Sequence, residues 1–231
     1  MKFFTLAPAA AAIVGTIAAP ILEANIKSPM PPTQTMAERD NNAGCIGKSQ
    51  KWEYPHPGSS ERYHSVYPLN NWLSFDCLFE MNRPTIESKN PNPSEAEQVR
   101  RAVLNAQAAT NVDPRIIFAV LMQESHGELR VGLTIQPDDH VSKNNGMMQC
   151  FGCKGAAHIP LSQPVNQALV NEMVLGGAVH LKGDLEKDGG DVFRALRAYN
   201  SGRTTWDLND PIAATRDYVW DCANRLVGWV W

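Results

Sequence analysis

The amino-acid sequence predicts an α+β fold that is mainly α-helical, with a small β-hairpin or sheet directly after one apolar helix. From residue 92 onward, several segments place apolar residues at the three- and four-residue spacing of an amphipathic helix. Over residues 129–135 the spacing changes to the two-residue alternation of a strand. The chain has 231 residues, of which 43% are hydrophobic, so it is long enough to bury one sizeable core.

Two helices are expected before the alternating stretch. The first begins at Ser94–Glu97, which has the sequence of a capping box. Its apolar stripe consists of Val99, Ala102, Val103 and Ala106. The second begins at Asp113–Pro114, because Asp is a favourable N-cap and Pro is tolerated at the first helical position. Residues 116–122 of this helix are apolar on all sides, which predicts a central, buried helix.

The remaining elements follow the same logic. Residues 129–135 are expected to form a strand, and turn-forming residues at 137–139 and 142–146 predict a hairpin or a small sheet. Asp191 is placed to cap a late helix. Three further helices are expected at residues 164–185, 192–199 and 212–226.

The N-terminus has the pattern of an export signal. Residues 1–18 are expected to be a signal peptide, because Lys2 precedes a short apolar run that ends in small residues. The run is too short, and too often interrupted by proline, for a membrane anchor. Residues 19–44 are rich in Pro, Asn, Thr and Ala, which predicts a linker. We therefore expect a secreted protein, or a periplasmic one in a bacterium, without a stable membrane anchor.

Residues 45–91 are expected to form an N-terminal extension to a domain that spans 92–231. Seven aromatic residues fall between Cys45 and Phe79, which predicts a packed, loop-rich subdomain. Residues 83–92 are polar and contain proline, which predicts a connector. Cys45 and Cys77 bracket the aromatic region and are candidates for a disulfide, although the sequence leaves the pairing of five cysteines open.

The other chemical signals exclude several classes of protein. Cys150 and Cys153 have the spacing of a redox or zinc motif, but no second cysteine pair accompanies them, so a structural disulfide is favoured. A formal net charge of -3 argues against a nucleic-acid partner. No metal or cofactor is expected, and we expect a monomer.

Glu124 is the most informative single residue. It continues the apolar face of Ile116, Ile117, Val120 and Leu121 on the predicted central helix. A carboxyl group on a buried face has a raised pKa and stays protonated near neutral pH. A protonated carboxylic acid is the group that glycosidases use to protonate a departing sugar oxygen. On periodicity alone, a carboxylate that is paired with Arg or solvated at a helix end is the favoured interpretation.

Three blocks in the chain resemble the goose-type lysozymes and the catalytic domain of soluble lytic transglycosylases. They are Glu-Ser-His-Gly at 124–127, Gly-Met-Met-Gln at 146–149 and Ala-Tyr-Asn-Ser-Gly at 198–202, in the order of that family. The flanking residues 111–114 and 215–219 agree, so the resemblance covers about residues 92–228. It implies a lysozyme-like fold and cleavage of β-1,4 bonds in an N-acetylated glycan, with peptidoglycan ahead of chitin as the partner.

The resemblance also implies roles for individual residues. Glu124 would be the single catalytic acid/base, and Gly146 would permit a tight turn. The residues implied to bind substrate are Ser125, Gly146, Met147, Met148, Gln149, Tyr199 and Asn200. Tyr199 also continues an apolar helical stripe and is equally compatible with a core position.

The chain departs from the goose-type pattern after Gln149. Cys150 and Phe151 stand where those enzymes carry an acidic residue that positions water. Asp138 and Asp139 are candidates for a second carboxylate, but turn residues are the simpler interpretation. Without a second carboxylate, lytic transglycosylation fits better than hydrolysis.

The alternatives are a hydrolytic lysozyme or chitinase of the same fold and a non-catalytic lysozyme-like glycan-binding protein. A serine hydrolase is disfavoured, because no nucleophile elbow surrounds Ser125.

Overall fold

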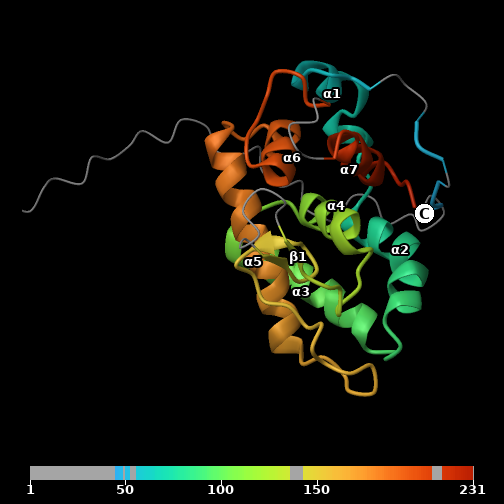
Figure 1. Cartoon of the computed structure of the whole chain (residues 1–231). Helices are drawn as coiled ribbons and strands as arrows, with labels where there is room; N and C mark the ends of the chain where they lie inside the picture. Colours follow the sequence, from blue (N-terminus) through green and yellow to red (C-terminus); the bar gives the residue numbers. More distant parts are fainter. Residues whose placement is uncertain (1–44, 49, 53–55, 136–142, 210–214, 231) are drawn as a thin grey trace, which may run out of the picture. The chain divides into compact units, whose positions relative to one another are not determined.

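The computed structural model describes residues 45–48, 50–52, 56–135, 143–209 and 215–230, all within one compact unit (Figure 1). The predicted signal peptide (1–18), the predicted linker (19–44), Asp138 and Asp139 lie outside the described residues. No helix among the described residues is long and apolar enough to cross a membrane.

The described residues form a mainly helical α+β fold, as predicted. The helices are α1 (Ser60–Val66), η3 (Leu69–Asn71), α2 (Phe75–Lys89), α3 (Glu95–Thr110), α4 (Pro114–Ser125), α5 (Gln167–Lys187), α6 (Val192–Ser201) and α7 (Tyr218–Leu226). The strands are β1 (Thr134–Ile135), β2 (Lys143–Asn145) and β3 (Cys150–Phe151), which form one antiparallel sheet in the order β1-β2-β3. Figure 1 shows α4 among the other helices, with α6 and α7 on one side of it and α2 and α3 on the other.

The central helix α4 begins where the sequence predicts. The Asp113 side chain accepts a hydrogen bond from Arg115 N, and Pro114 occupies the first turn. Almost every residue of α4 up to Met122 is buried. His126 adopts a left-handed conformation with φ of 54° and ends the helix, and Gly127 follows with φ of 77°. Glu124 therefore lies in the last turn of a buried helix.

The predicted strand over 129–135 is correct only at its end. β1 contains only Thr134 and Ile135, whereas Leu129 is fully buried outside the sheet. The backbone N–H of Leu129 donates a hydrogen bond to Asn90 Oδ1 at 3.0 Å. Asn90 also donates to the Gly127 carbonyl at 2.8 Å. These bonds hold the chain against the end of α2 before it reaches the sheet. Of the alternating apolar residues only Leu129 is buried, whereas Leu133 and Ile135 are about half exposed.

Two local predictions were wrong. Ser94 does not cap α3, because its own backbone is helical (φ −81°, ψ −14°) and its hydroxyl donates to Asn92 Oδ1. Residues 83–89 are not a connector, because α2 continues through Pro84 to Lys89. Pro84 removes one backbone hydrogen bond. The helix persists because it buries six side chains, among them Phe79 and Ile86, on both sides of the proline.

The aromatic residues of the N-terminal segment pack into the same core as the later helices. Phe75 of α2 contacts Phe118 of α4 edge-to-face, with ring centroids 5.7 Å apart. Tyr63 of α1 stacks on Phe193 of α6 at 5.1 Å. Each such pair adds stabilisation beyond the burial of its area. The segment therefore supports α4 and α6, which carry two of the three sequence blocks, rather than lying apart from them.

The disulfide predictions are confirmed. Cys45 pairs with Cys77, which ties the start of the described chain to α2. Cys150 pairs with Cys153 across β3 and the following turn. Cys222 of α7 is left as a free thiol and is fully buried.

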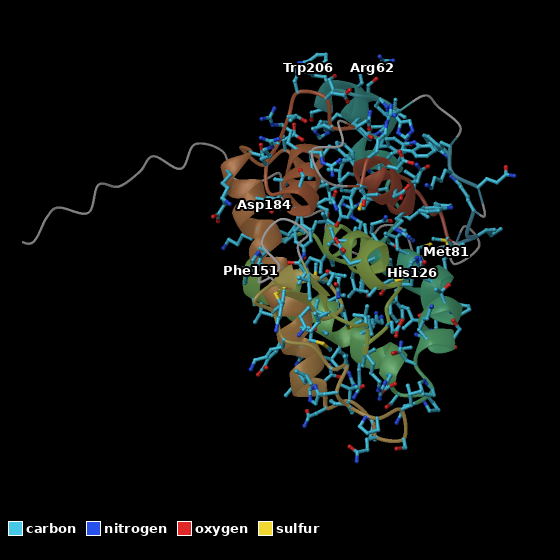
Figure 2. All side chains as sticks on the ribbon, viewed as in Figure 1. Arg62, Met81, His126, Phe151, Asp184 and Trp206 are labelled. Carbon is cyan, nitrogen blue, oxygen red and sulfur yellow. A yellow bond between two sulfur atoms is a disulfide. The ribbon has the colours of Figure 1, made fainter. Side chains whose placement is uncertain are left out.

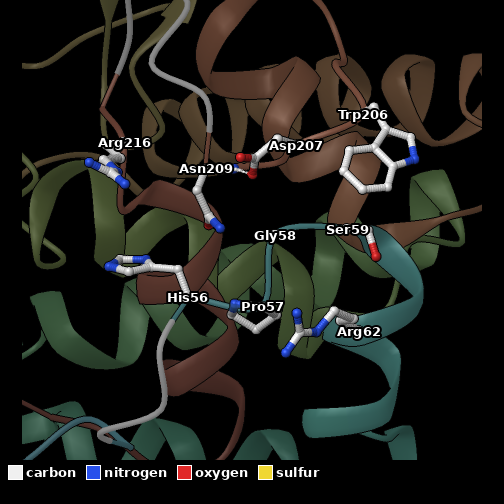
Figure 3. Close-up of a pocket in the computed structure, with 9 residues that line it drawn as sticks. All are labelled: His56, Pro57, Gly58, Ser59, Arg62, Trp206, Asp207, Asn209 and Arg216. Carbon is white, nitrogen blue, oxygen red and sulfur yellow. Dashed lines mark hydrogen bonds between the residues drawn. The ribbon is translucent and has the colours of Figure 1, made fainter.

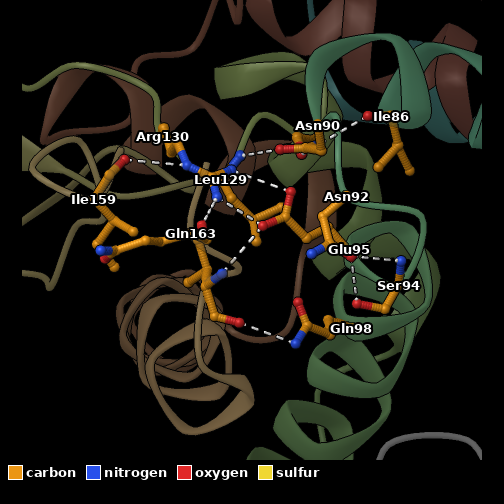
Figure 4. A network of polar contacts seen from close by, with 12 residues as sticks. Ile86, Asn90, Asn92, Ser94, Glu95, Gln98, Leu129, Arg130, Ile159 and Gln163 are labelled. Carbon is orange, nitrogen blue, oxygen red and sulfur yellow. Dashed lines mark hydrogen bonds and ion pairs between the residues drawn. The ribbon is translucent and has the colours of Figure 1, made fainter. Parts of the chain in front are cut away.

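A buried ion pair fixes the start of α3 to the segment after α4 (Figure 4). Both Glu95 oxygens accept from the Arg130 guanidinium, at 2.8 and 3.1 Å, and the Glu95 side chain is fully buried. Glu95 also accepts from Val165 N at 3.1 Å. Burial alone would raise the pKa of Glu95, but the hydrogen bonds from Arg130 and Val165 outweigh it and lower the pKa. Glu95 is thus an ionised carboxylate that joins the start of α3 to the segments around Arg130 and Val165.

Replacing Glu95 by Ala is expected to lower the free energy of unfolding by about 3–5 kcal/mol, because Arg130 is then left as an uncompensated buried charge. Chemical denaturation followed by circular dichroism measures this loss. Glu97→Ala on the same helix is the matched control, since Glu97 forms partly exposed pairs and its loss should cost less than about 1 kcal/mol. Equal losses for the two variants would contradict the assigned role of Glu95.

Candidate active site

Glu124 is a partly exposed carboxyl group with few polar neighbours. Its Oε1 accepts a hydrogen bond from the Tyr218 hydroxyl at 2.6 Å. Burial raises the pKa of Glu124 to about 7, and the Tyr218 hydrogen bond opposes that rise. Within the described residues, no charged side chain adds to either effect. The position of Glu124 in the last turn of α4 also disfavours its negative charge. The carbonyl groups at the C-terminal end of a helix lack intrahelical partners and carry a partial negative charge. The result is an accessible acid that is about half protonated at neutral pH.

Two tyrosines from different helices surround this carboxyl group. Tyr218 of α7 is buried and donates to Glu124 directly. Tyr199 of α6 donates to the Met148 carbonyl at 2.7 Å. Burial raises the pKa of each tyrosine well above its usual value, and the nearby charge of Glu124 raises it further. Both hydroxyls therefore remain protonated donors over the working pH range of Glu124.

The Gly146–Gln149 block forms a tight turn beside Tyr199. Gly146 has φ of 69°, and a Cβ on it would lie 2.2 Å from the Lys154 carbonyl oxygen, so only glycine fits. Gln149 N donates to Gly146 O at 3.0 Å and closes the turn. Met148 lies over α5, where a Cβ on Gly177 would meet the Met148 Cβ at 2.4 Å. The turn therefore packs closely against Lys154 and against α5, because Gly146 and Gly177 have no side chains in the way.

Met147 and Met148 are fully buried, so their side chains anchor the turn in the core. The Gln149 side chain lies within the loop. It accepts from Thr134 Oγ1 at 2.9 Å and donates to the carbonyls of Gly132 and Gly146 at 3.1 and 2.9 Å. These bonds connect the turn to the segment that leads into β1. Contact of Met147, Met148 or Gln149 with substrate stays a prediction.

Ser125 and Asn200 also make internal contacts. The Ser125 hydroxyl is buried and donates to the Leu121 carbonyl at 3.1 Å, rather than to His126. Asn200 Oδ1 accepts from Arg197 and from Thr215 N, which fixes the end of α6 to the chain that leads into α7. Substrate contacts by Ser125 and Asn200 stay predictions. The bond to Leu121 turns the Ser125 hydroxyl away from a nucleophilic arrangement.

The structure thus brings together Glu124, Tyr199 and the Met148 carbonyl from the three sequence blocks, and adds one residue to them. Tyr218 was absent from the predicted site. The only sequence signal for it was its place in the flanking block 215–219, because its contact with Glu124 spans 94 positions. Cys222 follows Tyr218 by one helical turn on the same buried face of α7. Within the described segments, no group of three or more His, Cys, Asp or Glu residues has the arrangement of a metal site.

A helical fold with a small sheet after the central helix, and a desolvated carboxyl group at the end of that helix, defines the lysozyme-like class of proteins. The family model of the transglycosylase SLT domain matches residues 101–216, half of the chain. The chain belongs to this transglycosylase SLT domain family, and its class is that of glycosidases and transglycosylases. The matched residues include all three predicted blocks. They exclude Tyr218 and the whole segment before Arg101.

Replacing Tyr218 by Phe is expected to raise the pKa of Glu124 above about 7, because the variant lacks the hydrogen bond that stabilises the charged carboxylate. A bond to a charged group is worth about 1.5–3 kcal/mol, so the shift should be about one pH unit or more. An activity that needs protonated Glu124 falls as the pH rises through this pKa. The falling limb of the pH–rate profile should therefore move to higher pH in the variant.

The matched control for Tyr218→Phe is Tyr199→Phe. The Tyr199 hydroxyl binds the Met148 carbonyl instead of Glu124, so its loss should leave the falling limb in place even if the rate drops. A falling limb that moves to lower pH in Tyr218→Phe, or that stays where it was, would contradict the assignment of Tyr218.

Proposed function

We propose that this protein is a secreted lytic transglycosylase that cleaves the β-1,4 bonds of peptidoglycan with Glu124 as its only acid/base. The observation that carries the proposal is the pKa of about 7 at Glu124, which burial produces without help from a second carboxylate among the described residues. The family match supports peptidoglycan as the substrate class. The two disulfides are compatible with an oxidising compartment outside the cytosol.

The reaction uses one proton carrier twice. Protonated Glu124 gives its proton to the bridging glycosidic oxygen as the bond from that oxygen to the sugar C1 breaks. The C6 hydroxyl of the same sugar then attacks C1, and its proton passes to the Glu124 carboxylate. The product carries an internal 1,6-anhydro ring, and the enzyme returns to its starting protonation state. No water molecule enters the balance, so no second carboxylate is required to activate one.

The surroundings of Glu124 suit this cycle. Partial burial keeps the acid form populated at neutral pH, and Tyr218 stabilises the carboxylate that exists between the two proton transfers. A hydrogen bond that strengthens when the carboxylate forms lowers the energy of the charged state when it is needed. Tyr199 and the Gly146–Gln149 turn form a rigid frame beside the acid, on which we place the N-acetylated sugar.

Replacing Glu124 by Gln is expected to reduce the clearing of a peptidoglycan suspension by at least about a hundredfold, because positioned general acids contribute about 10²–10⁴ in rate. Glu128→Gln is the matched control: Glu128 lies four residues further along the chain, and its loss should leave the rate unchanged. Undiminished clearing by Glu124→Gln would rule out the proposal.

Digestion of peptidoglycan in water labelled with ¹⁸O separates the two possible reactions. Transglycosylation gives anhydro ends without label, and hydrolysis gives reducing ends that carry it. Mass spectrometry of the soluble products should show unlabelled anhydro ends. Labelled reducing ends would replace the proposal by a hydrolytic lysozyme, and binding without soluble products would replace it by a glycan-binding protein.

A further inference from the structure

A cavity lies where the N-terminal segment meets the chain between α6 and α7 (Figure 3). Its volume is about 420 Å³, within the range of about 300–1,000 Å³ that is usual for ligand pockets. One wall comes from residues 56–59 and Arg62, which precede the family match, and the other from Trp206, Asp207, Asn209 and Arg216, which lie within it. The cavity therefore depends on residues both before and within the matched domain.

Internal hydrogen bonds hold the two walls together. Leu208 N donates to the Gly58 carbonyl at 2.8 Å, and the Tyr63 hydroxyl donates to Asn209 Oδ1 at 2.6 Å. Asn209 N donates in turn to Asp207 Oδ1 at 2.9 Å. Gly58 has φ of 81°, and its missing Cβ faces Asp207 and Asn209. The cavity thus has a preformed floor.

Two arginines at this cavity have no acidic partner. Arg62 and Arg216 are both exposed and form no ion pair with any residue that the structure describes. One carboxylate, that of Asp207, lines the same cavity, while Asp217 lies 3.5 Å from His56. Two guanidinium groups without an ion-pair partner among the described residues therefore line the cavity, in a chain whose net charge is -3. A guanidinium is the side chain best suited to a carboxylate, because its donors match both oxygens.

The remaining lining suits a sugar. Trp206 is 80% exposed at the rim, and Figure 2 shows it beside Arg62 at one end of the described unit. An exposed indole offers an apolar face for the C–H face of a pyranose ring. Asn209 is 5% exposed, and its amide nitrogen donates to no residue in the described ranges. Asn209 lines the cavity, so its amide group can donate to a ligand oxygen there.

We propose that this cavity binds a sugar residue that carries a carboxylate, within the same glycan strand that Glu124 cleaves. Trp206 stacks on the ring, Arg62 and Arg216 bind the carboxylate, and Asn209 donates to a ring substituent. This inference rests on the proposed function for its substrate. Arg216 lies only two residues before Tyr218, which links the cavity along the chain to the acid. The site would therefore select carboxylate-bearing peptidoglycan over neutral chitin.

Binding measurements on the Glu124→Gln protein test the proposal without cleavage. The probes are peptide-free strands of alternating N-acetylglucosamine and N-acetylmuramic acid, the same strands with their peptide stems, and chitohexaose. Arg62→Gln, Arg216→Gln and Trp206→Ala should each weaken binding of at least one carboxylate-bearing strand by about tenfold, the loss of one charge-assisted bond or stacking contact. The affinity for chitohexaose should be unchanged by the two arginine variants. Binding of peptide-free strands would support a carboxylate on the sugar, its lactyl group, whereas binding only of strands with peptide stems would overturn the proposal.

The matched controls are Arg101→Gln and Leu161→Ala, which remove an exposed charge and an exposed apolar side chain outside the cavity. Unchanged strand affinity in all three cavity variants would overturn the proposal. So would equal weakening by Arg101→Gln, or binding of polyglutamate as tight as that of the strands. Failure of the wild-type protein to cleave, with these binding losses intact, would refute the proposed function and leave the cavity's role standing.

Discussion

The structure depends on one constraint: a carboxyl group is held at the end of a buried helix with a single hydrogen-bond donor. α4 is apolar because it lies at the centre of the core, and its last turn carries Glu124 to the edge of that core. Removal from water raises the pKa of Glu124 to about 7. A shift from the ordinary value of 4.5 to about 7 corresponds to about 3 kcal/mol of disfavoured charge, so the surrounding helices must stabilise this arrangement.

The rest of the fold can be understood as the support of that carboxyl group. α7 provides Tyr218, and the aromatic contacts of α1 and α2 with α6 and α4 hold the helices around it. The Cys150–Cys153 disulfide follows the Gly146–Gln149 turn directly and lies against Gly176 of α5, where a Cβ would come within 2.8 Å of Cys153 Sγ. The disulfide thus joins the turn to the surface of α5. It limits the movement of the turn beside Tyr199.

The sequence could predict what depends on local pattern. The buried helix that carries Glu124, its Asp113–Pro114 start and the small sheet after it all follow from periodicity and capping, and the structure confirms them. Contacts between distant residues could not be predicted in this way. Tyr218 reaches Glu124 through the packing of α7 on α4, and no spacing in the sequence encodes that contact. Pro84 misled the prediction for the opposite reason, since a local helix-breaking signal was overridden by the burial of Phe79 and Ile86. Leu129 shows the same effect, because tertiary hydrogen bonding placed it outside the strand that its alternation predicted.

The most direct test of this account is a measurement of the pKa of Glu124 itself. Nuclear magnetic resonance of the side-chain carboxyl carbon, followed from acid to alkaline pH and assigned with Glu124→Gln, reports the protonation of this one group. The account predicts a midpoint of about 7. A midpoint at the ordinary glutamate value of 4.5 or below would show that Glu124 is ionised at neutral pH, and would contradict its role as the proton donor.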